Sequence, residues 1–188
     1  MTNSNKKPTV ATVWLDGCSG CHMSLMDLDE RLIDLAGLVD IVHSPVVDPK
    51  EFPASVDLTL VEGAVSSEED LHKAQIIRAR SKMVIALGDC AVTGNVPAMR
   101  NCWDRSDLFD RAYIDNAQEP PAPEMRRAAL PVVVVPALRP HATPLHEVIK
   151  VDLHLPGCPP PADAIWYVLT ELLAGRTPVP SEVSRFGK

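Results

Sequence analysis

A pair of cysteines directly after an apolar stretch is the feature that most limits what this chain can fold into. Residues 9–15 are rich in valine and threonine and predict a buried strand. Cys18 and Cys21 follow at once in a C-x-x-C sequence, and the residues after them predict the start of a helix. A strand that passes into a helix through a short loop is typical of α/β proteins with a parallel sheet.

Two more cysteines stand in the same kind of place. Cys90 follows the apolar residues 83–87, and Cys158 follows a predicted strand at 148–155. Ligands of open parallel sheets bind outside the carboxyl ends of the strands, so four thiols released at strand ends would meet at one edge. Cubane iron–sulfur clusters are held by four thiolates. The positions therefore predict a four-cysteine iron–sulfur site on an α/β scaffold.

Helical and extended patterns alternate along the rest of the chain. A stripe of leucines after Cys21 predicts one helix that ends at Gly37, and Ser66 or Ser67 is expected to cap a helix with an acidic start. The further predictions are strands at 39–42 and 58–61, a helix at 68–80, a short helix within 102–113 and a final helix between Pro161 and Gly175. Loops are expected at 45–53, 90–99 and 116–123, and the apolar stretch at 131–136 is bounded by prolines and need not be a central strand.

This alternation predicts a three-layer α/β sandwich with a mostly parallel, doubly wound sheet of the flavodoxin-like kind. A chain of 188 residues, 46% of them hydrophobic, has the length and composition for one globular core. We expect a flexible N-terminus at 1–8, a single cluster-binding α/β domain at 9–175 and a C-terminal tail at 176–188.

Charge and cysteine content narrow the class of function. A net charge of -7 argues against nucleic acid as a partner, since phosphate binding needs a basic face. No apolar run approaches the ~20 residues that span a bilayer, so no membrane insertion is expected. The polar N-terminus lacks the apolar core of a signal peptide and predicts a cytoplasmic protein. Five cysteines in that reducing compartment indicate metal or redox chemistry rather than disulfides.

The residues alone leave three alternatives to a cluster open. A structural zinc site uses the same residue type but normally has two local pairs, whereas Cys90 and Cys158 each stand alone. A thioredoxin-like dithiol would use only Cys18 and Cys21. The third alternative is four unrelated buried thiols. The sequence gives FMN no positive support and leaves its presence open, because the loop after the first strand, where such a sheet holds the FMN phosphate, carries cysteines here.

Four short motifs together resemble the small subunit of [NiFe] hydrogenases. They are Gly17–Cys21, Val61–Gly63, Gly88–Ala91 with Gly94, and Pro156–Pro160, and the resemblance runs from about residue 11 to residue 175. The related quinone-reductase subunit of respiratory complex I shares the Glu-Gly and Pro-Gly-Cys-Pro segments. It has two adjacent cysteines in place of C-x-x-C, so the hydrogenase resemblance is the stronger one.

The resemblance implies a role in electron transfer. Cys18, Cys21, Cys90 and Cys158 would bind one [4Fe-4S] cluster next to a nickel–iron centre that belongs to a separate large subunit. The chain ends soon after Cys158, as in the short, single-cluster small subunits of cytoplasmic NAD(P)-linked bidirectional hydrogenases. Hydrogen would be cleaved in the large subunit, and electrons would pass through this chain to iron–sulfur and flavin diaphorase subunits that reduce NAD+.

Three further residues lie near these motifs. Glu62 ends a predicted strand at the cysteine edge, where the residues alone are equally consistent with a solvated carboxylate. The resemblance implies that Glu62 lies near the cluster and aids proton movement or orients an arginine. His22 is expected to pack or donate a hydrogen bond near the cluster, and Cys102 is expected to be a spectator thiol rather than a ligand.

Overall fold

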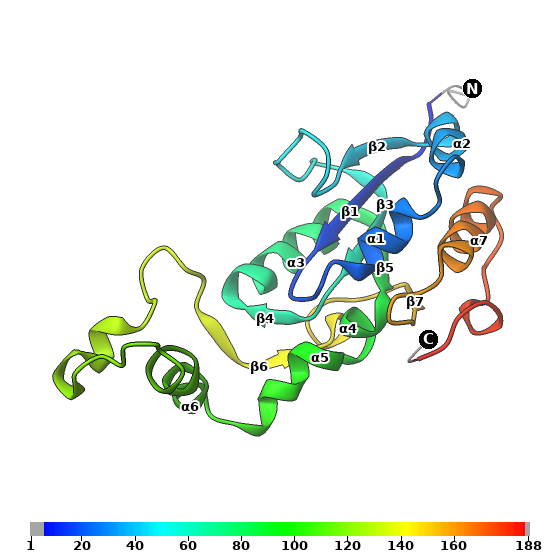
Figure 1. Cartoon of the computed structure of the whole chain (residues 1–188). Coiled ribbons are helices and arrows are strands. Elements are labelled where there is room, and N and C mark those ends of the chain that lie inside the picture. Colours follow the sequence, from blue (N-terminus) through cyan, green and yellow to red (C-terminus); the bar gives the residue numbers. More distant parts are fainter. Residues whose placement is uncertain (1–5, 187–188) are drawn as a thin grey trace.

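Five parallel strands form the main sheet of the computed structural model, which describes residues 6–186 (Figure 1). They are β1 (Thr9–Trp14), β2 (Asp40–His43), β3 (Val56–Glu62), β5 (Ser81–Leu87) and β7 (Leu153–Leu155). Their spatial order is β2-β1-β3-β5-β7, and every neighbouring pair is parallel. Numbered among themselves, these strands follow the doubly wound order 2-1-3-4-5 of flavodoxin-like sheets. The predicted fold class is confirmed.

Helices cover both faces of this sheet (Figure 1). One face packs against α1 (Gly20–Met26), α2 (Arg31–Leu38) and α7 (Ala162–Leu173), and the other against α3 (Glu68–Arg80) and α4 (Gly88–Thr93). Side chains of a strand alternate between the two faces, so Ile85 and Leu87 join the first core while Val84 and Ala86 join the second. Burial on both sides explains why the strands are continuously apolar in sequence.

The predicted leucine helix is wrong as a single element. The structure divides it into α1 and α2, separated by a turn at 27–30 in which Asp29 has a φ of 51°. A non-glycine residue in this left-handed region interrupts the helical hydrogen-bond ladder. Gly37 lies inside α2, which continues to Leu38. The leucine periodicity survives because both helices bury leucines against the same core.

The predicted loop at 90–99 is also wrong, since it contains α4 and the four-residue helix α5 (Asn95–Ala98). Gly94 has a φ of 84° and ends α4 in the left-handed conformation that glycine adopts without steric cost. Pro97 lies in the first turn of α5, where its missing N–H has no intrahelical acceptor to lose. Gly94 and Pro97 therefore mark helix ends here, not irregular backbone.

The acidic helix start was predicted correctly. Ser67 is the N-cap of α3: its hydroxyl accepts a hydrogen bond from the Asp70 N–H, and the Asp70 carboxylate accepts one from the Ser67 N–H. This reciprocal capping box satisfies two N–H groups that the helix itself leaves free. The helix then runs to Arg80, as its sequence indicated.

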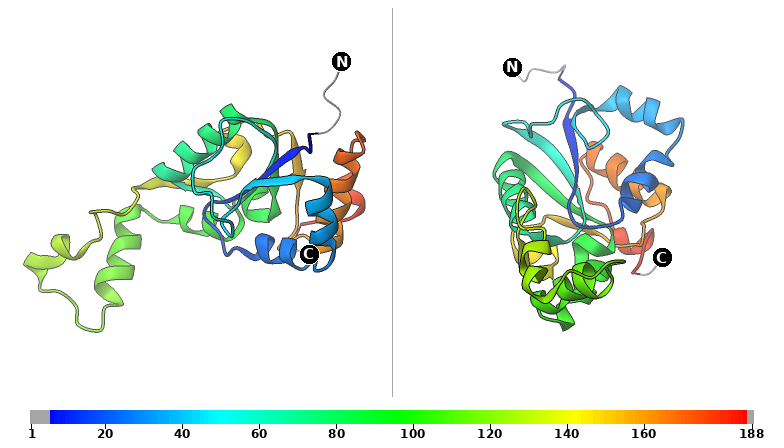
Figure 2. Two further views of the ribbon diagram at one scale, coloured as in Figure 1. Left: turned by 90° about the horizontal axis from the view of Figure 1, so that it is seen from above. Right: turned by 60° about the vertical axis from the view of Figure 1, so that its left-hand side comes forward.

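An arm projects from the body between the fourth and fifth strands of the sheet (Figures 1 and 2). A short antiparallel ribbon of β4 (Val65–Ser67) and β6 (Leu138–Thr143) lies at its base. Beyond the base it contains η1 (Met99–Cys102), α6 (Arg105–Asp110), η2 (Arg111–Asp115) and η3 (Pro123–Ala129). Residues 131–136 form no strand, and Val133 and Val134 in this stretch are exposed.

The remaining described segments are short. Leu145–Glu147 and Pro180–Glu182 form the 3-10 turns η4 and η5. In the tail, the Ser184 hydroxyl donates to the Pro156 carbonyl, next to the Cys158 loop. Of the predicted flexible N-terminus at 1–8, residues 1–5 lie outside the described residues. None of the helices within 6–186 combines the length and the apolar character that a bilayer crossing requires.

Candidate iron–sulfur site

The ends of three strands bring four cysteines to one edge of the sheet. Cys18 lies in the loop after β1, and Cys21 lies in the first turn of α1. Cys90 lies in α4, directly after β5, and Cys158 follows β7. All of these strands are parallel, so their carboxyl ends share this edge.

Backbone contacts between the loops hold the thiols near one another. The Asp89 N–H donates to the Gly157 carbonyl at 2.8 Å, and the Gly157 N–H donates to the Asp89 carboxylate at 2.7 Å. These two bonds tie the Cys90 segment to the Cys158 segment. Gly88 has a φ of 81°, and a Cβ placed on it would lie 2.2 Å from the Cys21 sulfur. The Cys21 thiol therefore rests directly against the start of α4.

The Cys18 loop is held against the end of β3. The Leu15 N–H donates to the Glu62 carbonyl at 2.8 Å, and Asp16 and Ala64 exchange two backbone hydrogen bonds at 2.7 and 3.1 Å. A Cβ at Gly63, whose φ is 94°, would approach the Leu15 carbonyl carbon to 2.8 Å. Only glycine permits this approach, which gives the Val61–Gly63 motif a steric reason.

The thiols affect each other electrostatically. Burial raises the pKa of Cys21, and the charges of Glu62, Cys90, Cys18 and Cys158 raise it further. Burial also raises the pKa of Cys90, as do the charges of Cys158 and Cys18. Negative groups this close disfavour one another's ionisation, and a cationic centre bound between thiolates would reverse that preference.

Hydrogen-bond donors and solvent exposure differ among the four sulfurs. The Asn95 side-chain amide donates to the Cys158 sulfur at 3.5 Å. A hydrogen bond from the Val96 backbone and one from the Asn95 side chain lower the pKa of Cys90 against the larger effect of burial. Cys21 is buried and Cys90 half-buried, whereas Cys18 and Cys158 are exposed. Asn95 was missed as a functional residue because the Gly94-Asn95 pair predicted only a loop.

Glu62 is buried, with 2% of its surface exposed, so it is not the solvated strand-end carboxylate that the residues alone allowed. Its Oε2 atom accepts a hydrogen bond from the His22 N–H at 2.9 Å and contacts His22 Nδ1. Within the described part of the chain, His22 Nε2 is buried without a hydrogen-bond partner. The His22 ring also packs edge-on against Trp14, with ring centroids 5.4 Å apart.

The donor set fits an iron–sulfur cluster. Four soft thiols lie at one edge of the sheet, and two of them are near amide donors. Gly88 occupies a position at which any side chain would displace the Cys21 sulfur. Across residues 6–186, no group of three or more His, Cys, Asp or Glu side chains is arranged to hold a single metal ion. In a four-iron cluster each thiolate binds a different iron, so the sulfurs need not converge on one point.

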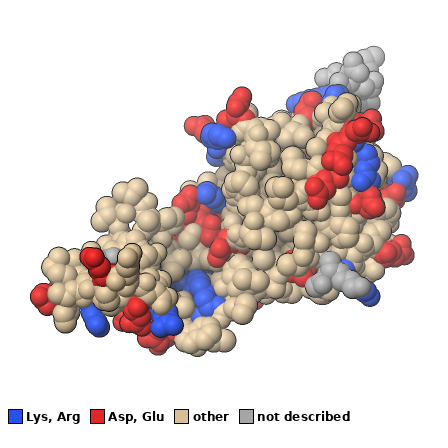
Figure 3. Space-filling model, in the orientation of Figure 1, with Lys and Arg blue, Asp and Glu red and all other residues tan. Residues whose placement is uncertain are grey.

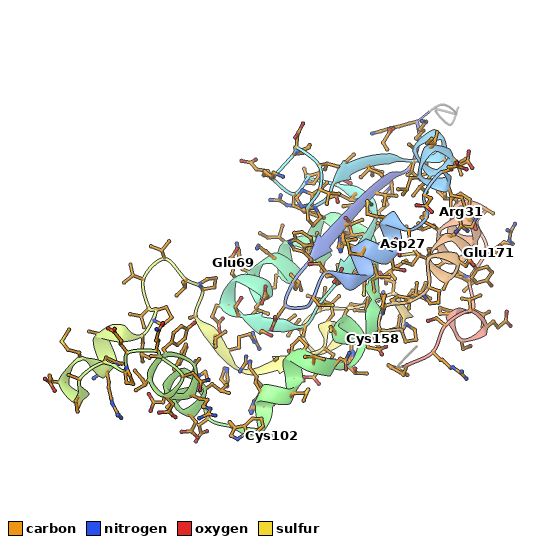
Figure 4. All side chains as sticks on the ribbon, viewed as in Figure 1. Asp27, Arg31, Glu69, Cys102, Cys158 and Glu171 are labelled. Atoms are coloured by element: carbon orange, nitrogen blue, oxygen red, sulfur yellow. The ribbon has the colours of Figure 1, made fainter. Side chains whose placement is uncertain are left out.

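Cys102 lies apart from the other four cysteines. It ends η1 in the arm, is exposed, and is well separated from Cys158 in Figure 4. We expect Cys102→Ser to leave the iron content per chain unchanged, because this thiol is far from the cysteine edge. Iron and sulfide analysis of the purified variant measures this, and a loss of iron would show that the ligand set includes Cys102.

Comparisons with known proteins show which family this chain belongs to. The family described as NADH ubiquinone oxidoreductase, 20 Kd subunit, matches residues 18–172. The NAD-reducing hydrogenase HoxS subunit delta of Cupriavidus necator is 39% identical over 186 residues, covering 98% of this chain and 88% of that subunit. One subunit of the F420-non-reducing hydrogenase of Methanothermobacter marburgensis is 39% identical over 173 residues. That match covers 90% of this chain but only 54% of the archaeal subunit.

The structural comparison covers nearly the whole chain. A crystal structure of an NAD+-reducing [NiFe]-hydrogenase in the H2-reduced state contains a chain with a TM-score of 0.82 and 36% sequence identity. The match covers 96% of this chain and 99% of that one. Both chains therefore share the fold over nearly their full length.

Proposed function

Because this chain belongs to the NADH ubiquinone oxidoreductase 20 Kd subunit family, and within it to the small subunits of NAD-reducing [NiFe] hydrogenases, we propose that it relays electrons through one [4Fe-4S] cluster. Cys18, Cys21, Cys90 and Cys158 are the proposed ligands. The chain is thus an oxidoreductase subunit, and hydrogen cleavage belongs to its partner. When bound, such a cluster accepts and releases one electron at a time.

The single observation that carries this proposal is the gathering of four thiols from three strand ends at one edge. This chain's own residues support a cluster there in three ways. The four sulfurs supply soft ligands, and burial at Cys21 limits water. Asn95 supplies an N–H donor, and hydrogen bonds to cluster sulfurs and ligands set the reduction potential.

The proposed partners are a large subunit that carries the nickel–iron centre and iron–sulfur and flavin diaphorase subunits that reduce NAD+. Cys18 and Cys158 are exposed, so a protein covering them would approach the cluster closely. In the view of Figure 3, Lys, Arg, Asp and Glu side chains lie mainly around the margin of the body, and its middle is largely free of them, which suits a contact that excludes water. We propose that the complex acts in the cytoplasm, where NAD+ is its acceptor.

Iron analysis and spectroscopy of the native complex test the cluster. We expect about four irons per copy of this chain, beyond those of the partner subunits, because four thiolates hold one cubane. A broad visible absorption should bleach with dithionite as the cluster is reduced, and H2 should produce the same bleaching. Purification of this chain with one zinc ion and no iron would contradict the proposal, as would a colourless chain with a redox-active dithiol.

A further inference from the structure

We propose that Glu62 is a positioning residue that caps α1 from the neighbouring strand and thereby fixes Cys21. The inference rests on the proposed cluster function and assigns Glu62 a task within it. The resemblance implied that Glu62 either aids proton movement or orients an arginine. The proposed role is orientation, and the group that Glu62 orients is the helix that carries Cys21.

The first turn of α1 has no capping hydrogen bond from its own N-cap side chain. The first N–H groups of a helix have no intrahelical acceptor, and a serine at the N-cap position normally accepts one of them. Here the N-cap residue Ser19 has a φ of 64° and its side chain makes no capping hydrogen bond. The left-handed conformation of Ser19 lets the C-x-x-C loop reverse direction. The N–H groups in the first turn of α1 therefore need an acceptor from another part of the chain.

Glu62 supplies that acceptor from 40 residues away in sequence. Its Oε2 accepts the N–H of His22, the third residue of α1, which directly follows Cys21. The same oxygen contacts His22 Nδ1, so one carboxylate oxygen holds both the backbone and the ring of His22. The partial positive charge of the helix N-terminus and these two donors offset the cost of burying a carboxylate.

The strand that carries Glu62 makes the cap rigid. β3 lies between β1 and β5 in the sheet, and Glu62 is paired with Trp14 on one side and Leu87 on the other. The next residue after Leu87 is Gly88, which the Cys21 sulfur contacts. The carboxylate therefore sets the position of Cys21 relative to the same sheet edge that presents Cys90.

Variants of the complete hydrogenase complex test this assignment. In Glu62→Gln the amide oxygen still accepts the His22 N–H, so we expect the iron content and the EPR g values to match those of the wild-type complex. In Glu62→Ala the cap is lost, and we expect loss of most of the iron of this subunit and altered EPR g values in what remains. A merely destabilised fold would lower the yield without changing the g values or the potential.

Glu68 provides matched controls, since it is an exposed glutamate in the first turn of α3. Glu68→Gln and Glu68→Ala should match the wild-type complex in iron content, g values and potential. Equal behaviour of Glu62→Ala and Glu68→Ala would overturn the inference, and so would a Glu62→Gln complex that loses iron although its amide oxygen can still accept the His22 N–H. If Glu62→Ala does not accumulate, the iron content and g values of Glu62→Gln against Glu68→Gln decide alone.

Two further outcomes have defined meanings. A Glu62→Gln complex with wild-type iron, g values and potential but without turnover would make Glu62 a proton carrier and refute the positioning role. A wild-type complex in which this chain holds no iron would overturn the proposed function and, with it, this inference.

Discussion

Replacing Cys18 by alanine should abolish the cluster and H2-dependent NAD+ reduction together. Cys18 is one of the four thiols that the structure gathers, and its sulfur is exposed, so the variant opens no large cavity in the core. Loss of a residue that only supports a metal ligand already costs about 10–100-fold in metal affinity or activity. Loss of the ligand itself should therefore lower turnover by at least about 100-fold.

Three measurements on the same preparation check this prediction. Iron per chain, the EPR signal of the dithionite-reduced complex and the rate of NAD+ reduction by H2 should all fall in Cys18→Ala. Cys102→Ser serves as the control, because it removes a thiol of the same chain from outside the cysteine edge. Wild-type turnover in Cys18→Ala would remove Cys18 from the ligand set.

Gly88→Ala should also destroy the site, although no ligand is changed. The new methyl group would lie 2.2 Å from the Cys21 sulfur, so Cys21 must move. The φ of 81° at this position adds roughly 1–2 kcal/mol of strain for any residue other than glycine. We expect loss of iron, a fall in the free energy of unfolding of more than ~1 kcal/mol and a reduced melting temperature.

Gly37→Ala is the matched control for that substitution. Gly37 lies in helix α2, has no atoms within 4 Å of an added Cβ, and does not adopt a positive φ. Alanine should stabilise this helix by roughly 0.5–1 kcal/mol and leave the iron content unchanged. Thermal unfolding and iron analysis of both variants separate a general glycine effect from the contact with Cys21. Retention of full iron in Gly88→Ala would contradict the close approach of the two loops.

The strands and the cysteine edge were predictable because their signals are local. Val, Ile and Leu in short runs predict strands that are buried on both faces, and the structure buries residues such as Leu60 and Ile85 completely or nearly so. Cys90 and Cys158 follow such runs directly. Once the sheet is parallel, topology alone brings the ends of these runs to one edge, so sequence position was enough to predict that the thiols would be neighbours.

The errors arose where tertiary contacts outweigh local pattern. The leucine periodicity predicted one helix. In the structure Asp29 adopts a left-handed conformation that divides this segment, and both halves still bury leucines in one core. Gly94 and Pro97 were treated as loop signals, although glycine also ends helices and proline fits a first turn. Neither distinction can be made from the residue type without its backbone conformation.

By itself, the sequence determined the α/β class, the order of the strands along the chain and the four cysteines that meet, since hydrophobic periodicity and residue chemistry are properties of short segments. Only the tertiary structure decided that Glu62 is buried and caps the helix of Cys21, that Asn95 donates to the Cys158 sulfur, and that an arm extends between β5 and β7. The physical reason is that hydrogen bonds and burial depend on which distant segments become neighbours. His22 and Glu62, 40 residues apart, carry no local signal of their pairing.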